Sequence, residues 1–246
     1  MKRFNMQAIC IILVLTISLF SKVKAQAPQK ENSLTAKQQS LIAISAQTAK
    51  GDLTALKENL NTGLDGGLTV NEIKEAILHS YAYCGFPRSI RGLQTLMTVL
   101  DERKSKGIND VPGAEASAIT PEGNKFDRGK AILEKLTGVK ESGPKKGYAA
   151  FAPTMEVFLK EHLFADIFER DVLSYKDREL VTISVISSIG AAEPMLRSHL
   201  NICLNLGLTA SQLQQFIDVV KPIIGKEKTL VAKNELNEVL KNKNKN

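Results

Sequence analysis

The chain repeats one pattern of short blocks at an interval of about 140 residues. The first copy reads SLIAIS at 40–45, LKENLN at 56–61 and GLT at 67–69, and the second reads ELVTIS at 179–184, LRSHLN at 196–201 and GLT at 207–209. Ser184 follows Ser45 by 139 residues and Gly207 follows Gly67 by 140, which fits one residue inserted in a turn. Such a fixed period indicates two structural units of the same kind.

Local signals predict that both units are helical. Residues 69–72 (TVNE) and 209–212 (TASQ) have the form of a capping box, in which two side chains satisfy backbone amides at a helix start. Gly67 and Gly207 lie just upstream, where a left-handed glycine ends the preceding helix. Apolar residues follow a helical period, and no long stretch alternates as a strand does. We therefore expect an all-α fold.

The composition of the intervening chain predicts where the units end. Residues 105–125 are rich in Gly, Pro, Asn and small side chains and are expected to form a linker. The first unit should then cover 30–104 and the second 126–240, opened by a helix over Phe126–Leu136. A Lys/Asn tail follows at 241–246.

The N-terminal 25 residues have the form of a secretory signal peptide. Two basic residues precede the apolar run Ala8–Phe20, and Val23–Ala25 gives a small-x-Ala cleavage pattern. The run is shorter than the ~20 residues that a membrane-spanning helix needs. We expect removal of residues 1–25, export to the periplasm or the medium, and no membrane span afterwards.

The basic net charge does not indicate a nucleic-acid partner. The predicted signal carries four basic and no acidic residues, so its loss lowers the charge from +7 to +3, and three lysines of the tail account for the remainder. Trp is absent and no strip combines arginines with aromatic residues. The expected partner is a small-molecule substrate.

The second half resembles the carboxymuconolactone decarboxylase family, whose all-helical fold is shared with the alkylhydroperoxidase AhpD. The resemblance is carried by FDRGKAILEKLTG at 126–138, FADIFER at 164–170, DRELVTI at 177–183, LRSHL at 196–200 and NLGLT at 205–209. It implies two tandem AhpD-like units that assemble into a homo-oligomer.

The first half resembles the other end of the same family pattern. It carries GLTVNEIKE at 67–75 and LHSYAYCGFP at 78–87. The copies differ at matched positions, where Asn59 stands against His199, Glu72 against Gln212 and Glu75 against Gln215. One composite site shared by both copies would explain these differences, and so would partial loss of function.

The resemblance implies decarboxylation of a carboxylactone. This reaction needs a cation for the substrate carboxylates, stabilisation of the electron pair left behind, and a proton donor. Arg, His and Glu side chains suffice, so no organic cofactor is expected. The histidines, His79, His162 and His199, have no metal-ligand spacing, so no metal is expected either.

His199 is the first candidate for general acid or base, because it matches the family histidine and lies on an inward-facing helical stripe. A core histidine is the alternative.

Glu72 matches a family acid, but a glutamate is also useful there as the third residue of a capping box. Arg178 and Arg197 are candidate holders of a substrate anion, and Arg178 with Glu179 can equally form a charged helix start.

Glu75, His79 and Tyr83 follow one another at steps of four, so they share one helix face. They could form a polar relay, with His79 as a catalytic group and Tyr83 against the substrate. A solvated helix face is the alternative.

Cys84 is a candidate reactive thiol. AhpD-type reductases use a Cys-x-x-Cys pair, in which the second thiol resolves the first. Here Gly85–Pro87 follows Cys84, so the resolving cysteine is missing, although a one-cysteine peroxidase using an external thiol stays open. Cys203 is expected to be a packing residue, and the sequence does not specify whether it pairs with Cys84.

The sequence therefore predicts cofactor-free, lyase-type acid/base chemistry on a small carboxylated lactone or a related compound. A peroxiredoxin-like antioxidant using Cys84 and a non-catalytic binding or scaffold protein are the alternatives. A closed polar pocket containing His199 would separate catalysis from scaffolding.

Overall fold

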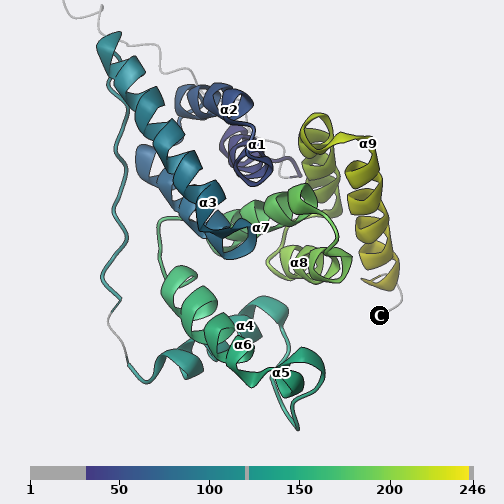
Figure 1. The fold of residues 1–246 in the computed structure, drawn as a ribbon. Coiled ribbons are helices and arrows are strands. Elements are labelled where there is room, and N and C mark those ends of the chain that lie inside the picture. The colour runs from purple at the N-terminus through teal and green to yellow at the C-terminus, as the bar shows by residue number, and fades with distance from the viewer. Residues whose placement is uncertain (1–31, 120–121, 244–246) are drawn as a thin grey trace, which may run out of the picture. The chain divides into compact units, whose positions relative to one another are not determined.

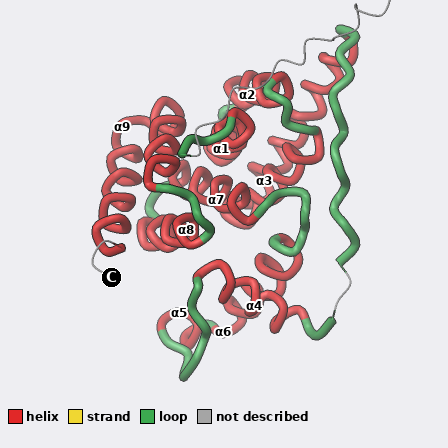
Figure 2. The backbone as a smooth tube through the Cα atoms, turned by 180° about the vertical axis from the view of Figure 1, so that it is seen from behind, coloured by secondary structure: helices red, strands yellow, loops and turns green. Residues whose placement is uncertain are grey.

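The computed structural model describes residues 32–119 and 122–243, and within these ranges every regular element is helical (Figure 2). The elements are α1 Ala36–Lys50, α2 Leu53–Asp65, α3 Val70–Ser105, α4 Lys125–Thr137, α5 Gly147–Phe151, α6 Pro153–Phe158, the π-helix η1 Leu159–Ile167, α7 Tyr175–Ile189, α8 Glu193–Asn205 and α9 Ala210–Lys243. The predicted all-α fold is confirmed. The predicted signal peptide and the last three tail residues lie outside the described residues.

The repeat is visible in the backbone. Helices α1, α2 and α3 correspond to α7, α8 and α9, and Gly67 and Gly207 both have positive φ, at 90° and 85°. Both long helices also bend at a glycine: Gly85 has φ 80° and ψ 161°, and Gly225 has φ 80° and ψ 172°. These two glycines are 140 residues apart, the interval of the sequence repeat.

Helices α1 and α7 pack against each other and join the two copies (Figure 1). Gln38 of α1 donates from Nε2 to Oδ1 of Asp177 on α7 at 3.0 Å, and these two residues occupy equivalent positions in the repeat. Val181 of α7 is buried in the core built by α1, α2 and α3, whereas Ile42 of α1 is buried in the core built by α7, α8 and α9. Each copy therefore completes the hydrophobic core of the other.

The first part of the predicted linker is tied to the start of α3. The backbone amides of Val70 and Asn71 donate to the carbonyl oxygens of Val111 and Pro112, at 3.0 and 2.9 Å. The Asn71 side chain donates to the Gly113 carbonyl oxygen at 3.2 Å. These bonds satisfy amides that a helix start leaves unpaired, so this part of the linker helps to cap α3.

Helix α4, one residue longer at each end than predicted, packs closely on η1. Ile132 and Leu136 of α4 form a small core with Phe164 and Phe168 from η1 and the residue that ends it. Gly129 allows the close approach, because a Cβ atom there would lie 1.9 Å from the carbonyl oxygen of Lys160.

We expect Gly129→Ala to lower the free energy of unfolding by about 2 kcal/mol or more, since the added methyl group meets backbone rather than a flexible side chain. Urea denaturation followed by circular dichroism measures this loss. Ala131→Leu adds more volume on the exposed side of the same helix and is the matched control. Equal stabilities of the two variants would contradict the close approach.

Candidate functional site

A buried polar cluster lies between α3, α7 and α8. Glu75, His79 and Tyr83 come from α3, Arg178, Glu179 and Thr182 from α7, and His199 from α8. Glu75 is 3 % exposed and His79 is fully buried. The alternative of a solvated face for this part of α3 is therefore wrong, because the face is covered by the second copy.

Two arginines hold the Glu75 carboxylate. Arg170 binds it through Nε and Nη2, each at 2.9 Å, and Arg178 adds a bond from Nη2 at 2.7 Å. Burial acts to raise the pKa of Glu75, but the two guanidinium groups outweigh it and hold the pKa below its usual value. Arg178 is itself fully buried, and its Nη2 also donates to the Arg170 carbonyl oxygen at 2.6 Å. Arg178 is thus not part of an exposed, charged helix start.

The tautomer of His79 follows from its partners. Its Nδ1 faces Arg178 Nη1 at 3.3 Å, and its Nε2 lies 2.8 Å from the Thr182 hydroxyl oxygen. A guanidinium can only donate, so Nδ1 accepts and Nε2–H donates to Thr182. Burial and the Arg178 charge hold the pKa of His79 well below its usual value. This geometry suits a positioning group that stays neutral.

His199 and Glu179 form the second part of the cluster. His199 Nδ1 lies 2.8 Å from Glu179 Oε2, and the two side chains are 15 % and 0 % exposed. The carboxylate accepts, so Nδ1–H donates and the lone pair remains on Nε2. No described residue bonds to Nε2. A carboxylate that orients an imidazole and leaves its second nitrogen free is the arrangement of a general base.

Tyr83 lies between the two histidines. Its ring centroid is 5.5 Å from that of His79 and 5.9 Å from that of His199. Burial and then the Glu179 carboxylate raise the pKa of Tyr83 well above its usual range despite the opposing effects of Thr182 and Arg178, so the phenol stays neutral.

Three buried polar atoms of this cluster have no hydrogen-bond partner among the described residues: Tyr83 Oη, Arg178 Nε and Glu179 Oε1. An unpaired buried polar group costs about 1–3 kcal/mol. The cluster thus leaves two donors and one acceptor without a partner among the described residues.

Neither described cysteine has the features of an activated nucleophile. Cys84 and Cys203 are both free thiols, so they do not form a disulfide with each other. The Cys84 thiol donates to the Ser80 carbonyl oxygen at 3.2 Å. Burial raises the pKa of Cys84 despite the opposing effects of Ser89 and Arg88, and burial raises the pKa of Cys203 well above its usual value.

Two other predicted site residues have partners outside the cluster. Glu72 accepts from the Thr69 amide at 2.7 Å in a complete capping box and pairs with Lys37 at 3.1 Å, which agrees with its structural role. Arg197 donates from Nε to Glu235 on α9 at 2.6 Å, and its side chain is 49 % exposed. The structure does not bring Glu72 or Arg197 to His199.

Sequence reasoning missed two partners, Arg170 and Glu179. Arg170 closes one family-like block, but its bond to Glu75 joins residues 95 positions apart. Glu179 follows Arg178 directly, and consecutive helical residues face different directions. Arg178 therefore reaches α3 while Glu179 reaches α8. The adjacent opposite charges were the available signal, although they did not identify the partners.

The equivalent place in the other copy carries none of these ionisable side chains. By the repeat interval, the counterparts of Glu75, His79, Tyr83, Arg178, Glu179 and His199 are Gln215, Val219, Ile223, Gln39, Ser40 and Asn59. There Gln215 accepts from the Leu34 amide at 2.9 Å, and Gln39 donates to the Leu34 carbonyl oxygen at 3.2 Å. The copies therefore build one polar cluster, with α3 from the first and α7 and α8 from the second.

The described ranges contain neither a metal-binding cluster nor a membrane-spanning helix. No group of three or more His, Cys, Asp or Glu side chains there is arranged to hold a metal ion. No helix there has the length and apolar character needed to cross a bilayer.

The fold and the cluster define an all-α protein of two tandem helical units joined around one composite site. The carboxymuconolactone decarboxylase family profile matches residues 19–96 and 153–238. The chain belongs to the carboxymuconolactone decarboxylase family. No curated protein matches it at a significant level.

The neutral state of buried His79 predicts a pH dependence of stability. Below about pH 6.5 this histidine is protonated in the unfolded chain but stays neutral in the folded protein. The unfolded state therefore binds more protons, so stability falls as the pH decreases. We expect the free energy of unfolding to drop between pH 7.5 and 5.5. In His79→Gln the slope should be smaller by up to about 1.4 kcal/mol per pH unit.

Urea denaturation at several pH values measures this slope. His162→Gln removes a histidine whose side chain is 53 % exposed and is the control that should keep more of the wild-type slope than His79→Gln. A His79→Gln variant with the full wild-type slope would show that His79 is protonated in the folded protein.

Proposed function

We propose that the composite site carries out cofactor-free acid/base chemistry on a small carboxylated compound, with a carboxylated lactone as the substrate class. The observation that supports this most is the Glu179–His199 pair, which leaves Nε2 without a partner and lies next to the Tyr83 ring, at 5.9 Å between the centroids of Tyr83 and His199. Family membership supports the same chemistry without fixing the substrate.

In the proposed reaction the bond between the substrate carboxylate and the ring breaks, and carbon dioxide leaves. The electron pair of that bond passes into the conjugated lactone carbonyl, giving an enolate. The Tyr83 hydroxyl donates a hydrogen bond to the enolate oxygen. His199 takes up one proton from solvent at Nε2 and passes this proton to the carbon that lost the carboxylate. The enolate is thereby converted to the neutral lactone product.

The remaining groups of the cluster position the substrate and the Tyr83 and His199 side chains. Arg178 offers its unpaired Nε–H to a substrate carboxylate, because its Nη2 is committed to Glu75 and to the Arg170 carbonyl. His79 bonds Arg178 on one side and Thr182 on the other, and so fixes α3 against α7. The charges of two arginines and two glutamates balance, so the cluster can be buried without a further counter-ion.

Three further parts of the proposal, which are export, the bounds of the two units and oligomerisation, are supported by the sequence. The predicted signal peptide supports export, and the repeat supports units at 30–104 and 126–240. The family resemblance supports a homo-oligomer.

We expect His199→Gln to lower kcat/KM by about 10²- to 10⁴-fold, because the proton donor is lost. Glu179→Gln should cause a comparable loss, because the imidazole loses the carboxylate that orients it. The measurement is carbon dioxide release from a panel of small carboxylated lactones that includes carboxymuconolactone.

Asn59→Ala is the matched control, since Asn59 is the repeat counterpart of His199 and bonds only to the Ala55 carbonyl of its own helix. It should retain wild-type turnover. Undiminished turnover in His199→Gln would refute the assignment. If the wild type neither turns over nor binds any member of the panel, the protein is a scaffold and the proposal is wrong.

The alternative function of a thiol peroxidase requires a reactive Cys84, whereas our proposal predicts an unreactive one. Burial raises the pKa of this thiol, so we expect iodoacetamide at pH 7.5 to alkylate Cys84 at least tenfold more slowly than glutathione. Hydroperoxide turnover with excess dithiol should be the same in Cys84→Ser and in wild type. Rapid alkylation of Cys84, together with turnover lost in the mutant, would make the protein a thiol peroxidase.

A further inference from the structure

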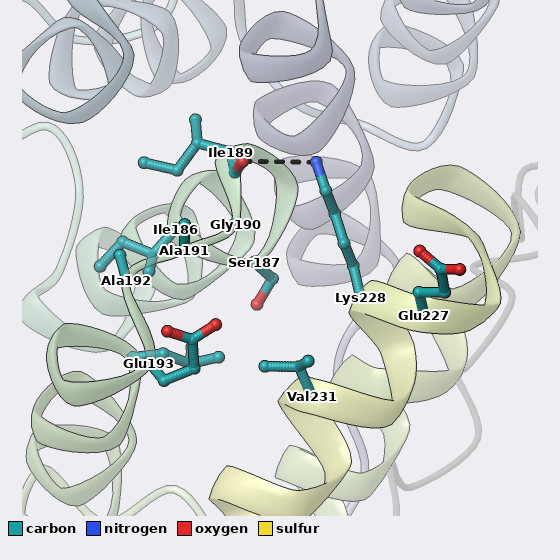
Figure 3. Close-up of a pocket in the computed structure, with 11 residues that line it drawn as sticks. Ile186, Ser187, Ile189, Gly190, Ala191, Ala192, Glu193, Glu227, Lys228 and Val231 are labelled. Carbon is teal, nitrogen blue, oxygen red and sulfur yellow. Dashed lines mark hydrogen bonds between the residues drawn. The ribbon is translucent and has the colours of Figure 1, made fainter.

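A cleft lies where α7 ends and α8 begins (Figure 3). Its volume is about 320 Å³, and the second half of α9 forms one wall. Ile186, Leu196 and Val231 supply apolar surface, and Ser187 and Glu193 supply polar groups. None of the residues of the acid/base cluster lines it.

Ser187 has a buried hydroxyl without a partner. The residue is 4 % exposed, and its Oγ bonds to no described group. Ser184 and Ser188 of the same helix bond to carbonyl oxygens four residues back, at 2.6 and 2.8 Å. Ser187 does not use this option, and its oxygen points into the cleft on the side of Glu193 (Figure 3). A buried hydroxyl in this position needs a partner that the cleft's occupant would supply.

The charges at the cleft favour a cation. Glu193 is half-buried and makes no ion pair or hydrogen bond with any described side chain. The Lys228 ammonium does not neutralise it, because it binds the carbonyl oxygens of Ser188 and Ile189 at the end of α7. Those carbonyls form the negative end of the helix, which Lys228 offsets. Glu193 lies in the first turn of α8, whose positive end stabilises it, and its carboxylate faces Ser187 without a side-chain counter-ion (Figure 3).

The backbone at the rim is strained. Ala191 has φ 54°, and no other non-glycine residue in the described ranges has a positive φ. Such a conformation is unfavourable for a residue with a Cβ atom and is concentrated at binding and catalytic sites. At the equivalent corner of the first copy, Arg88 covers Gly51 so closely that a Cβ atom there would lie 1.5 Å from Nη1. In the second copy Lys228, the repeat counterpart of Arg88, lies against Gly190 at this corner, where a Cβ atom would be 3.2 Å from its Cε.

We propose that this cleft binds a small organic cation, a primary ammonium carrying an apolar body of about ten non-hydrogen atoms. The ammonium group binds between the Glu193 carboxylate and the Ser187 hydroxyl, whose oxygen accepts a hydrogen bond from one of its N–H groups. The apolar body packs against Leu196 and Val231. The proposal does not depend on the chemistry at His199.

Three probes of nearly equal size test the charge preference on the full chain: phenethylammonium, 2-phenylethanol and 3-phenylpropionate. Isothermal titration calorimetry should give a Kd for phenethylammonium at least tenfold lower than for the alcohol, and no binding of the carboxylate. Glu193→Gln should weaken phenethylammonium binding at least tenfold, and Ser187→Ala severalfold.

Glu227→Gln is the matched control, because Glu227 lines the same cleft but points away from Ser187 and Glu193 (Figure 3). It should change the Kd by less than threefold. Val231→Phe, which fills the cleft from α9, should abolish binding, and circular dichroism establishes that each variant is folded. Equal binding of the three probes, a preference for the carboxylate, no binding at millimolar concentration, or an unchanged Kd in folded Glu193→Gln would each overturn the proposal.

Discussion

The packing of α1 against α7 is the contact on which the rest of the structure depends. Each of these helices is buried on two sides. One side packs in the core of its own copy, and another side packs in the core of the other copy. A helix buried in this way cannot expose its polar residues to water, so they must find partners inside the protein. Arg178, Glu179 and Thr182 of α7 do so with α3 on one side and α8 on the other.

Charge balance explains why this polar cluster can exist in the interior. Buried charges are tolerated when they are paired and hydrogen-bonded. Arg170 and Arg178 are matched by Glu75 and Glu179, and His79 stays neutral against a guanidinium. What remains unpaired is a short list of atoms around Tyr83 and His199. The network thus pairs its charges and leaves these few atoms available, which is the basis of the proposed function.

The two copies carry different side chains at equivalent places. The first copy has Glu75 on α3 and Asn59 on α2, whereas the second has Gln215 on α9 and His199 on α8. The corner after the first helix is built alike in both copies, because Arg88 lies against Gly51 in the first and its counterpart Lys228 lies against Gly190 in the second. Because the copies share their cores, the differences at the polar positions are tolerated without loss of the fold.

The sequence by itself determined the helices, their ends and their repetition. Capping boxes, left-handed glycines and a 3.6-residue apolar period act over a few residues, so they can be identified without tertiary information. It also singled out His199 and the shared face of Glu75, His79 and Tyr83. Only the tertiary structure decided that this face is buried, that Arg178 is committed to Glu75, that Glu179 orients His199, and that a cleft opens beside Ser187. These contacts join residues up to about 100 positions apart, and their geometry depends on how α1 and α7 pack together, which no local pattern specifies.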